Sequence, residues 1–152
     1  MKKLVSLALA FVCIFSLAGC IPENTVNIKF PFAVEDVVNI EMYHSSASSN
    51  PEMKMIESKE DIKELYEKIE RISCKIKDSE ETASPEITSF RFNLTDGTNY
   101  ELIYVCYGVK TGRLISHTGK FDYFTSADIG WNWVWLNQEL TAVTVGESEM
   151  PK

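Results

Sequence analysis

The sequence predicts an α+β domain in which one amphipathic helix packs on one face of an antiparallel β-sheet. Two observations lead to this class. Apolar and polar side chains alternate through several short segments, among them 37–43, 89–94 and 100–106, with the period of half-buried strands. One stretch, 58–72, instead carries apolar side chains at helical spacing. The length of the chain suits one compact domain and leaves little room for a second.

The first predicted strand, 37–43, places Val38, Ile40 and Met42 on one face and polar side chains on the other. A serine-rich segment that ends in a proline follows this strand, and we expect a loop there. A short second strand through 53–56 comes after the loop.

The predicted helix begins at Ser58, which forms a variant capping box with Asp61 over the free N–H groups of the first turn. On the solvent face, Glu64 precedes Lys68 by four residues, which is the favourable order for an ion pair. This face holds as much acid as base, which disfavours a membrane-surface helix. The stripe expected to face the core consists of Ile62, Leu65, Tyr66, Ile69 and Ile72.

After a short strand at 74–77, the strongest hairpin signal is the dipeptide Asp96-Gly97 between two alternating segments. A two-residue loop would place the apolar Phe92 opposite the charged Glu101. We therefore predict a three-residue loop over 96–98. The pairs expected from that register are Leu94 with Tyr100, Phe92 with Leu102 and Phe90 with Tyr104.

The chain is expected to continue as an antiparallel meander, through a strand near Leu114 and another at 120–125. In the final segment, 128–140, three tryptophans at alternate positions fit a strand, whereas a longer apolar stripe fits a helix. We predict a short C-terminal helix, with Ser126 as its cap. Its apolar stripe consists of Ile129, Trp133, Leu136 and Leu140.

The N-terminus has the layout of an export signal: Met1-Lys2-Lys3, an apolar run over 4–15, then Leu17-Ala18-Gly19-Cys20. The last four residues resemble the lipobox of bacterial lipoproteins. That resemblance implies attachment of a diacylglyceryl group, with acyl chains such as palmitate, to Cys20 and cleavage between Gly19 and Cys20. A membrane-spanning anchor is disfavoured, because it needs about 20 apolar residues and this run is shorter.

The resulting division of the chain is a signal peptide over 1–19, a membrane tether over 20–33, one α+β domain over 34–145 and a loose tail over 146–152. We expect the mature protein at the cell membrane, on the extracytoplasmic face. Two acyl chains are sufficient for stable anchoring, since each buried CH₂ contributes roughly 0.8 kcal/mol.

The charge of the protein is acidic, with 15 basic and 22 acidic side chains in the full sequence. Cleavage would remove two of the lysines and leave 13 basic against 22 acidic side chains, a formal charge of −9. Such a balance argues against nucleic acid as a partner, because its phosphates reward clustered Lys and Arg.

Two cysteines of the predicted domain, Cys74 and Cys106, fall on strands that could be neighbours. Outside the cytoplasm they could form a disulfide. The alternative is two unpaired thiols that fill space in the core, and we favour that alternative.

The two histidines lie at strand ends, and neither His44 nor His117 belongs to a spaced metal-binding motif. Histidines in such places are usually solvated. No nucleophile elbow or phosphate-binding glycine loop is present in the sequence. We therefore assign no catalytic residue, cofactor or metal.

The tryptophans give the one suggestion of a binding surface. If Trp133 faces the core, Trp131 and Trp135 point elsewhere, and exposed tryptophans often mark interaction sites. The alternative is that both rings cover the edge of a small core.

The order of elements after the lipobox resembles small uncharacterised lipoproteins of Firmicutes. The likeness is carried by the strand 37–40, the helix start 58–62 and the turn 95–98. These families have no established activity, so the resemblance implies location and fold.

We expect a membrane-anchored, non-catalytic domain that binds a protein, peptide or small ligand. One alternative is a small hydrolase or metal-dependent enzyme that uses His44 or His117. Another is an accessory or immunity protein that intercepts a cationic peptide. A histidine that shares a cleft with a carboxylate or a hydroxyl would favour the enzyme.

Overall fold

The structure is a computed structural model of the whole chain, and it describes residues 25–76, 85–135 and 140–152. The predicted lipid-attachment residue, Cys20, lies outside these ranges. The backbone of Trp135 is described, but its side chain lies outside the description.

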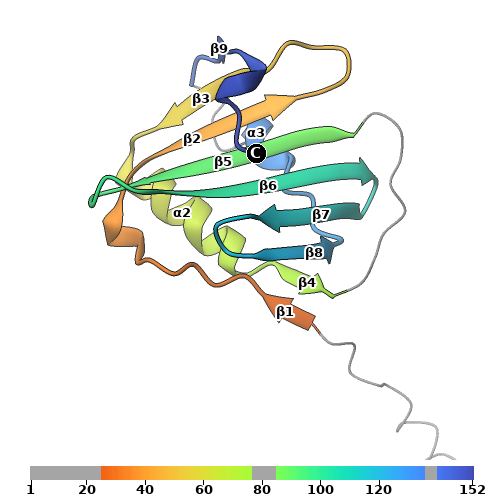
Figure 1. Cartoon of the computed structure of the whole chain (residues 1–152), viewed down its shortest axis with the longest axis horizontal. Helices are drawn as coiled ribbons and strands as arrows, with labels where there is room; N and C mark the ends of the chain where they lie inside the picture. Colours follow the sequence, from red (N-terminus) through yellow and green to blue (C-terminus); the bar gives the residue numbers. More distant parts are fainter. Residues whose placement is uncertain (1–24, 77–84, 136–139) are drawn as a thin grey trace, which may run out of the picture.

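The described residues form one antiparallel sheet of nine strands, in the order β1-β4-β8-β7-β6-β5-β2-β3-β9 (Figure 1). Together with the helices, this sheet confirms the α+β class. The strands are β1 (Thr25–Asn27), β2 (Val37–Ser45), β3 (Glu52–Ile56), β4 (Ser73–Lys75), β5 (Glu86–Leu94), β6 (Asn99–Gly108), β7 (Thr111–Ser116), β8 (Phe121–Thr125) and β9 (Val143–Thr144). The helical segments are η1 (Val34–Asp36), α2 (Lys59–Glu70), α3 (Trp131–Trp135) and η2 (Glu147–Glu149).

The buried core cluster contains side chains of the sheet and of α2, which crosses behind the sheet in Figure 1. Alternate residues of the central strands point into it, as their period requires. Ser58 Oγ accepts a hydrogen bond from the N–H of Asp61, 3.4 Å away, at the start of α2. The helical side chains Ile62, Leu65 and Ile69 belong to the same buried cluster as Ile40, Met42, Phe90, Phe92, Tyr100, Leu102, Tyr104 and Leu114.

The start of β2 departs from the predicted alternation. A bulge between Val37 and Asn39 interrupts the pairing of β2 with β5. As a result Val37 is buried and Val38 is exposed, although Val38 was expected on the same face as Ile40. An extra residue in one strand shifts its side chains by one position, which the sequence period does not reveal.

The segment 25–33, expected to be a free tether, is part of the folded domain. Strand β1 pairs with β4, and Ile28 is buried in the core. Phe30 and Phe32 pack against the same core. Apolar residues alternate with polar ones from Val26 through Phe30, and this period-2 signal lies within the segment 20–33 that was predicted to be the tether.

The predicted register of the β5–β6 hairpin is wrong by two residues. Phe92 lies opposite Tyr100 rather than Leu102. The loop has the predicted three residues, but they are 95–97, and Gly97 has a φ of +82°. A three-residue hairpin loop requires a left-handed residue at its last position, and glycine adopts that conformation without steric cost.

The C-terminal part of the chain contacts both faces of the sheet. Helix α3 begins where Asp128 Oδ1 accepts a hydrogen bond from the N–H of Trp131, at 3.2 Å, so the cap is Asp128 rather than Ser126. Residues 146–152, expected to be a loose tail, include η2 and a buried Pro151. This segment crosses the face opposite α2, where Arg91 Nη2 donates to the carbonyl of Glu149.

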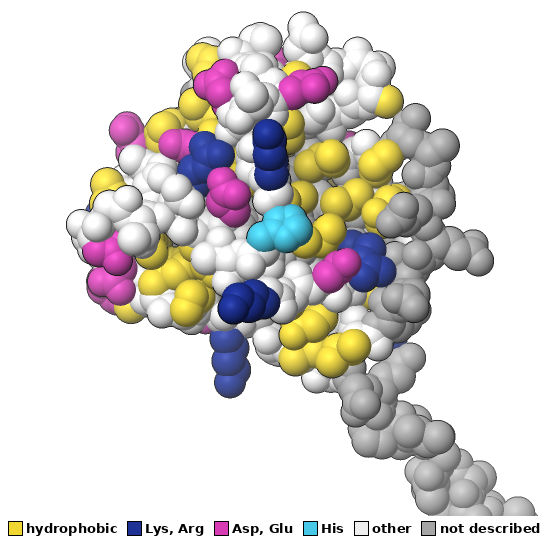
Figure 2. Space-filling view, viewed as in Figure 1, with side chains coloured by type: hydrophobic (Ala, Val, Ile, Leu, Met, Phe, Trp, Pro, Cys, Tyr) yellow, Lys and Arg dark blue, Asp and Glu magenta, His cyan; other side chains and the backbone are white. Residues whose placement is uncertain are grey.

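The face opposite α2 carries a cross-strand ladder of charges, and Figure 2 shows acidic and basic side chains close together on this face. Arg91 of β5 lies between Glu41 of β2 and Glu101 of β6, with N–O distances of 2.8 and 2.9 Å. These opposite charges stand side by side on neighbouring strands, where such pairs stabilise the sheet. Within the described residues, no helix combines the length and apolar character needed to cross a bilayer.

Candidate functional site

Two adjoining cavities lie beside α3, at the end of the sheet where β5 begins and β6 ends. Their volumes are about 150 and 490 Å³, and both are lined by Cys106 and Asp128. We call the pair the Trp131 groove. The smaller cavity is also lined by Glu86, Thr88, Gly130, Trp131 and Val134, and the larger by Tyr104, Gly108, Val109, Lys110 and Ser126.

The pairing of β5 with β6 explains why these residues meet. Glu86 stands opposite Cys106, and Thr88 stands opposite Tyr104. All four share the face of the core residue Phe90, because alternate strand residues point the same way. At this end of the sheet, the core-facing side of β5 and β6 carries these four side chains, which have polar atoms and line the groove.

Three exposed apolar side chains border this groove. Trp131 is 54% exposed, Val134 is 51% exposed and Val109 is 92% exposed. They are three of the six large apolar side chains that are exposed among the described residues, so the exposure is concentrated here. Exposed apolar side chains scattered singly are normal, whereas a cluster of them indicates an interaction site.

Trp131 was predicted from the sequence as a possible interaction residue, whereas its neighbours around the groove were not. Trp133 packs against the core, as the helical period suggested, and Trp131 points away from it. Val134 lies three residues after Trp131 on α3, whereas Val109, from the turn after β6, reaches the groove only through the fold, so nothing in the local sequence marks it. Asp128 could have been predicted from the sequence, because aspartate is a preferred N-cap residue of helices.

His44 lies next to this groove and is held from three sides. Its Nδ1 is 3.3 Å from the hydroxyl of Thr88, and its Nε2 is 3.3 Å from a carboxylate oxygen of Glu86. Its ring stacks on Trp133, with centroids 5.2 Å apart. Lys54 Nζ also donates to the carbonyl of Trp133, at 3.0 Å. This cluster fastens α3 to the sheet and leaves both ring nitrogens with protein partners.

His44 thus differs from the solvated strand-end histidine that the sequence suggested, whereas His117 is exposed at the turn after β7. The two residues are not brought together, since β5 and β6 separate their strands. Over residues 25–76, 85–135 and 140–152, no three His, Cys, Asp or Glu side chains converge as a metal site would require.

Burial lowers the pKa of His44 below its ordinary value of 6.5. The carboxylates of Glu86 and Glu52 oppose this shift, and the nearby Lys54 adds to it. A lowered pKa means that the folded protein holds fewer protons than the unfolded chain near this pH. The stabilisation from the neutral ring is therefore complete above pH 6.5 and is lost as the pH falls toward the folded-state pKa.

We expect wild type to lose unfolding free energy relative to a His44→Gln variant as the pH falls below 6.5. Urea unfolding of both proteins at a series of pH values measures the difference. Stability curves that run parallel through this range would contradict the assignment. A His117→Gln variant is the matched control, because that imidazole is solvent-exposed.

Cys74 and Cys106 are both free thiols, as the sequence analysis favoured. Strands β8 and β7 separate them in one row of the sheet. Three strand spacings amount to about 14 Å, whereas the Cα atoms of a disulfide lie within about 7 Å. Burial raises the pKa of the Cys74 thiol to about 11, so this cysteine stays protonated.

Comparisons of the chain with protein families, with curated proteins and with solved structures found no match.

Proposed function

We propose that this protein is a membrane-anchored lipoprotein of the extracytoplasmic face, whose folded domain binds a partner without catalysis. The anchor rests on Leu17-Ala18-Gly19-Cys20 after a basic start and an apolar run. In this proposal the paired strands β5 to β8 are a meander that serves as a rigid scaffold, and α2 is the cover of its core face. The pairing of consecutive strands and the shared buried cluster support this arrangement.

The binding surface that we propose is the Trp131 groove, and the observation that carries the proposal is the concentration of exposed apolar side chains around it. Two unequal cavities that meet at Cys106 and Asp128 suit an extended occupant better than one compact ligand. We infer that the occupant is a protein or peptide segment that inserts one apolar side chain into each cavity. Trp131 would then be the aromatic anchor of the interface.

Photocrosslinking in the native membrane tests this surface. With p-benzoylphenylalanine in place of Trp131, we expect an adduct of discrete mass, whose peptide can be sequenced. The matched control is the same replacement at Val143, which is similarly exposed (49%) but lies on β9, outside the groove. The same adducts from both positions, or none from position 131, would refute the groove.

Once the crosslinked partner is identified, Trp131→Ala should weaken its binding by about 2 kcal/mol or more, roughly thirtyfold. Val143→Ala should leave the affinity unchanged. Both side chains are exposed, so neither change should alter the unfolding free energy by more than about 0.5 kcal/mol.

The enzymatic alternative has one observation in its favour, namely that His44 contacts both a carboxylate and a hydroxyl. Against it, Thr88 is buried, and both nitrogens of the ring are engaged within the fold. With p-benzoylphenylalanine at position 131, the double variant His44→Gln, His117→Gln is expected to give the same crosslinked adduct as the protein that keeps both histidines. Loss of the adduct with unchanged stability would favour the enzyme.

A further inference from the structure

Most of the exposed apolar side chains of the described residues lie at one end of the sheet. This is the end where β1, β5 and β7 begin and where β4, β6 and β8 stop, on the right of the view in Figure 1. The two most exposed of them, Val109 at 92% and Ile76 at 69%, are both found there. Trp131 and Val134 border the groove at the same end, so it holds four of the six large apolar side chains that are exposed among the described residues.

Val109 stands at the tip of the two-residue turn between β6 and β7. Gly108 pairs with Thr111 across this turn, and Lys110 has a φ of +55°. The Thr111 hydroxyl donates to the carbonyl of Val109, at 3.3 Å, and helps to fix the turn. Glycine and small polar residues dominate such turns, because they suit the backbone conformation there. A valine held at the tip, with most of its side chain in water, gains little burial from the fold of a single molecule.

Ile76 follows directly on β4, which lies next to the edge strand β1. Two to three strand spacings separate β4 from the β6–β7 turn, which amounts to about 10–14 Å. Ile76 and Val109 therefore project from nearby points of the same end. Single exposed apolar side chains are normal, whereas several at one place indicate an interaction surface.

The proposed lipid anchor would leave the domain from this same end. Thr25, the first residue of β1, stands opposite Lys75, the residue before Ile76. The extended chain from Cys20 to Thr25 reaches about 18 Å at most. Acyl chains at Cys20 would therefore hold this end of the sheet close to the headgroups, with Ile76 one strand away from the start of the tether.

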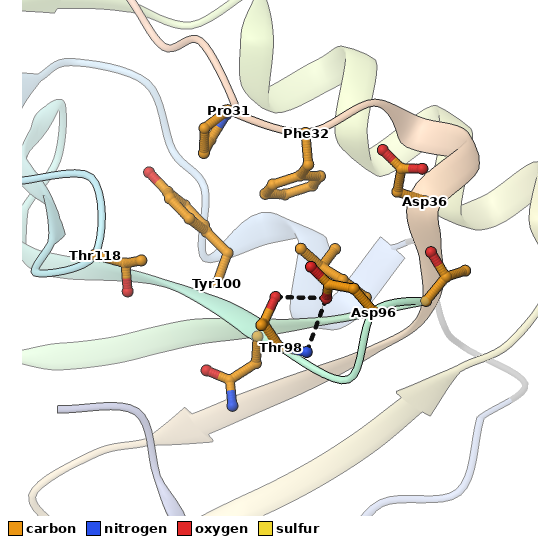
Figure 3. A pocket seen from close by; sticks show the side chains of 10 residues that line it. Pro31, Phe32, Asp36, Asp96, Thr98, Tyr100 and Thr118 are labelled. Atoms are coloured by element: carbon orange, nitrogen blue, oxygen red, sulfur yellow. Dashed lines mark hydrogen bonds between the residues drawn. The ribbon is translucent and has the colours of Figure 1, made fainter.

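The opposite end of the sheet has a different character, and Figure 3 shows part of it from close by. The carboxylates of Asp36 and Asp96 lie there, beside the β5–β6 turn. Of the six exposed apolar side chains, Val38 at the start of β2 belongs to that end. Removing carboxylates from water is costly, so we expect the opposite end to face away from the membrane.

We propose that the end of the domain that carries Ile76 and Val109 rests on the outer surface of the bilayer, with both side chains inserted where the headgroups meet the acyl chains. The inference rests on the lipid anchor proposed above, because two aliphatic side chains are too few to hold the domain on a membrane by themselves. The short tether raises their effective concentration at the bilayer, which makes a weak insertion sufficient. Beside Val109, the exposed Lys110 keeps its stem along the apolar layer and its ammonium group at the phosphates.

This orientation also fixes where the Trp131 groove opens. The groove lies on the core-facing side of the same end, and Val109 borders it. The groove therefore opens beside the bilayer, at about the level of the headgroups, and a partner segment must reach it there. The docked surface itself does not depend on that partner.

Fluorescence quenching in vesicles tests the docked end. The probe is the full-length protein purified from membranes, with dansylalanine in place of Val109, in phosphatidylcholine vesicles whose acyl chains carry bromine. We expect strong quenching compared with unbrominated lipid, because inserted side chains lie roughly 5–10 Å deep, at the boundary of headgroups and acyl chains. Phosphatidylcholine has no net charge, so general electrostatic attraction does not contribute. The matched control is dansylalanine in place of Val38, which should be quenched severalfold less.

A charge at the second side chain tests whether the two act as one surface. Ile76→Glu should reduce the quenching at position 109 severalfold, because docking would take the new carboxylate out of water. The control Val143→Glu, on the far edge strand β9, should leave the quenching unchanged. All three side chains are exposed, so thermal unfolding should stay close to wild type. An Ile76→Glu variant that is quenched like its parent would overturn the proposal.

Sedimentation with the vesicles separates the docked end from the anchor. Ile76→Glu should sediment like wild type, since its acyl chains remain, so that lost quenching reports docking alone. Complete sedimentation with equal quenching at positions 109 and 38 would overturn the docked end and leave the anchor standing. Protein that does not sediment would overturn the anchor, and the docked end with it. Trp131→Ala should leave the quenching intact, so failure of the groove is distinguishable from both.

Discussion

A Cys20→Ala variant is expected to leave the membrane and collect in the aqueous phase, because the change removes the proposed acylation site. Loss of two acyl chains removes roughly 0.8 kcal/mol for every buried CH₂, which amounts to nearly all of the membrane affinity of a soluble domain. Detergent-phase partitioning, together with incorporation of labelled palmitate, measures the effect. Wild type should enter the detergent phase and carry the label.

Cys13 provides the matched control for that experiment. It lies in the apolar run of the signal, so Cys13→Ala should be exported, acylated and retained like wild type. Equal partitioning of the Cys20→Ala variant and wild type would refute the lipoprotein assignment. Equal loss in both variants would trace the effect to export rather than to acylation.

The paired strand β1 changes how closely the anchor would hold the domain. Four residues, 21–24, lie between Cys20 and Thr25, the first residue of β1, so the chain makes five residue-to-residue steps from one to the other. Fully extended, they reach about 18 Å at most. A free tether over 20–33 would reach more than twice as far. The anchored domain is therefore expected to stay near the headgroups, with the β1 edge of its sheet closest to the membrane.

The largest effect on stability is expected from Leu65→Ala. Leu65 of α2 is fully buried, at 0% exposure. Removal of a buried leucine side chain leaves a cavity and typically costs 2–5 kcal/mol. Urea unfolding should show a lower midpoint with little change in slope.

Glu64 is the control for this prediction, because it is the preceding residue on the same helix and is exposed. Its ion pair with Lys68, at 3.6 Å, lies in solvent and is worth only about 0.3–0.5 kcal/mol. Glu64→Ala should therefore shift the midpoint slightly. Equal shifts in the two variants would mean that the helix does not bury the side predicted for it.

The features that sequence analysis predicted correctly depend on neighbouring residues. The helix expected over 58–72 is found at Lys59–Glu70, because its cap and its apolar stripe are both encoded within one segment. The α+β class follows in the same way from short alternating runs. Local periodicity determines which side of an element is apolar, and it does so before any partner is known.

The hairpin register shows what local periodicity does not determine, namely which residues of two strands stand opposite each other. The choice of a three-residue loop was correct, and only its position was wrong by one residue. The turn geometry would have corrected it, since the left-handed position at the end of such a loop should be assigned to Gly97. A one-residue shift of the loop moves the pairing by two, so every residue kept its predicted face while its partner changed.

The candidate sites could be predicted less well because they depend on contacts between distant segments. Trp131 was identified from its residue type, but Cys106 and Asp128 join it only through strand pairing and the position of α3. The rings of Phe32 and Tyr100 pack together, with centroids 5.4 Å apart, although they come from segments that were predicted to be a tether and a strand. No local period links them.

The two edge strands of the sheet affect whether neighbouring copies of this protein aggregate through their sheets. The outermost strands of the sheet are very short, because β1 has three residues and β9 has two. A short edge offers few unpaired N–H and C=O groups to another chain, which is one way in which natural sheets avoid edge-to-edge aggregation. The proposed lipid anchor would hold the molecules in one plane, where they would collide often. These edges would let many copies lie close together without joining their sheets into a fibre.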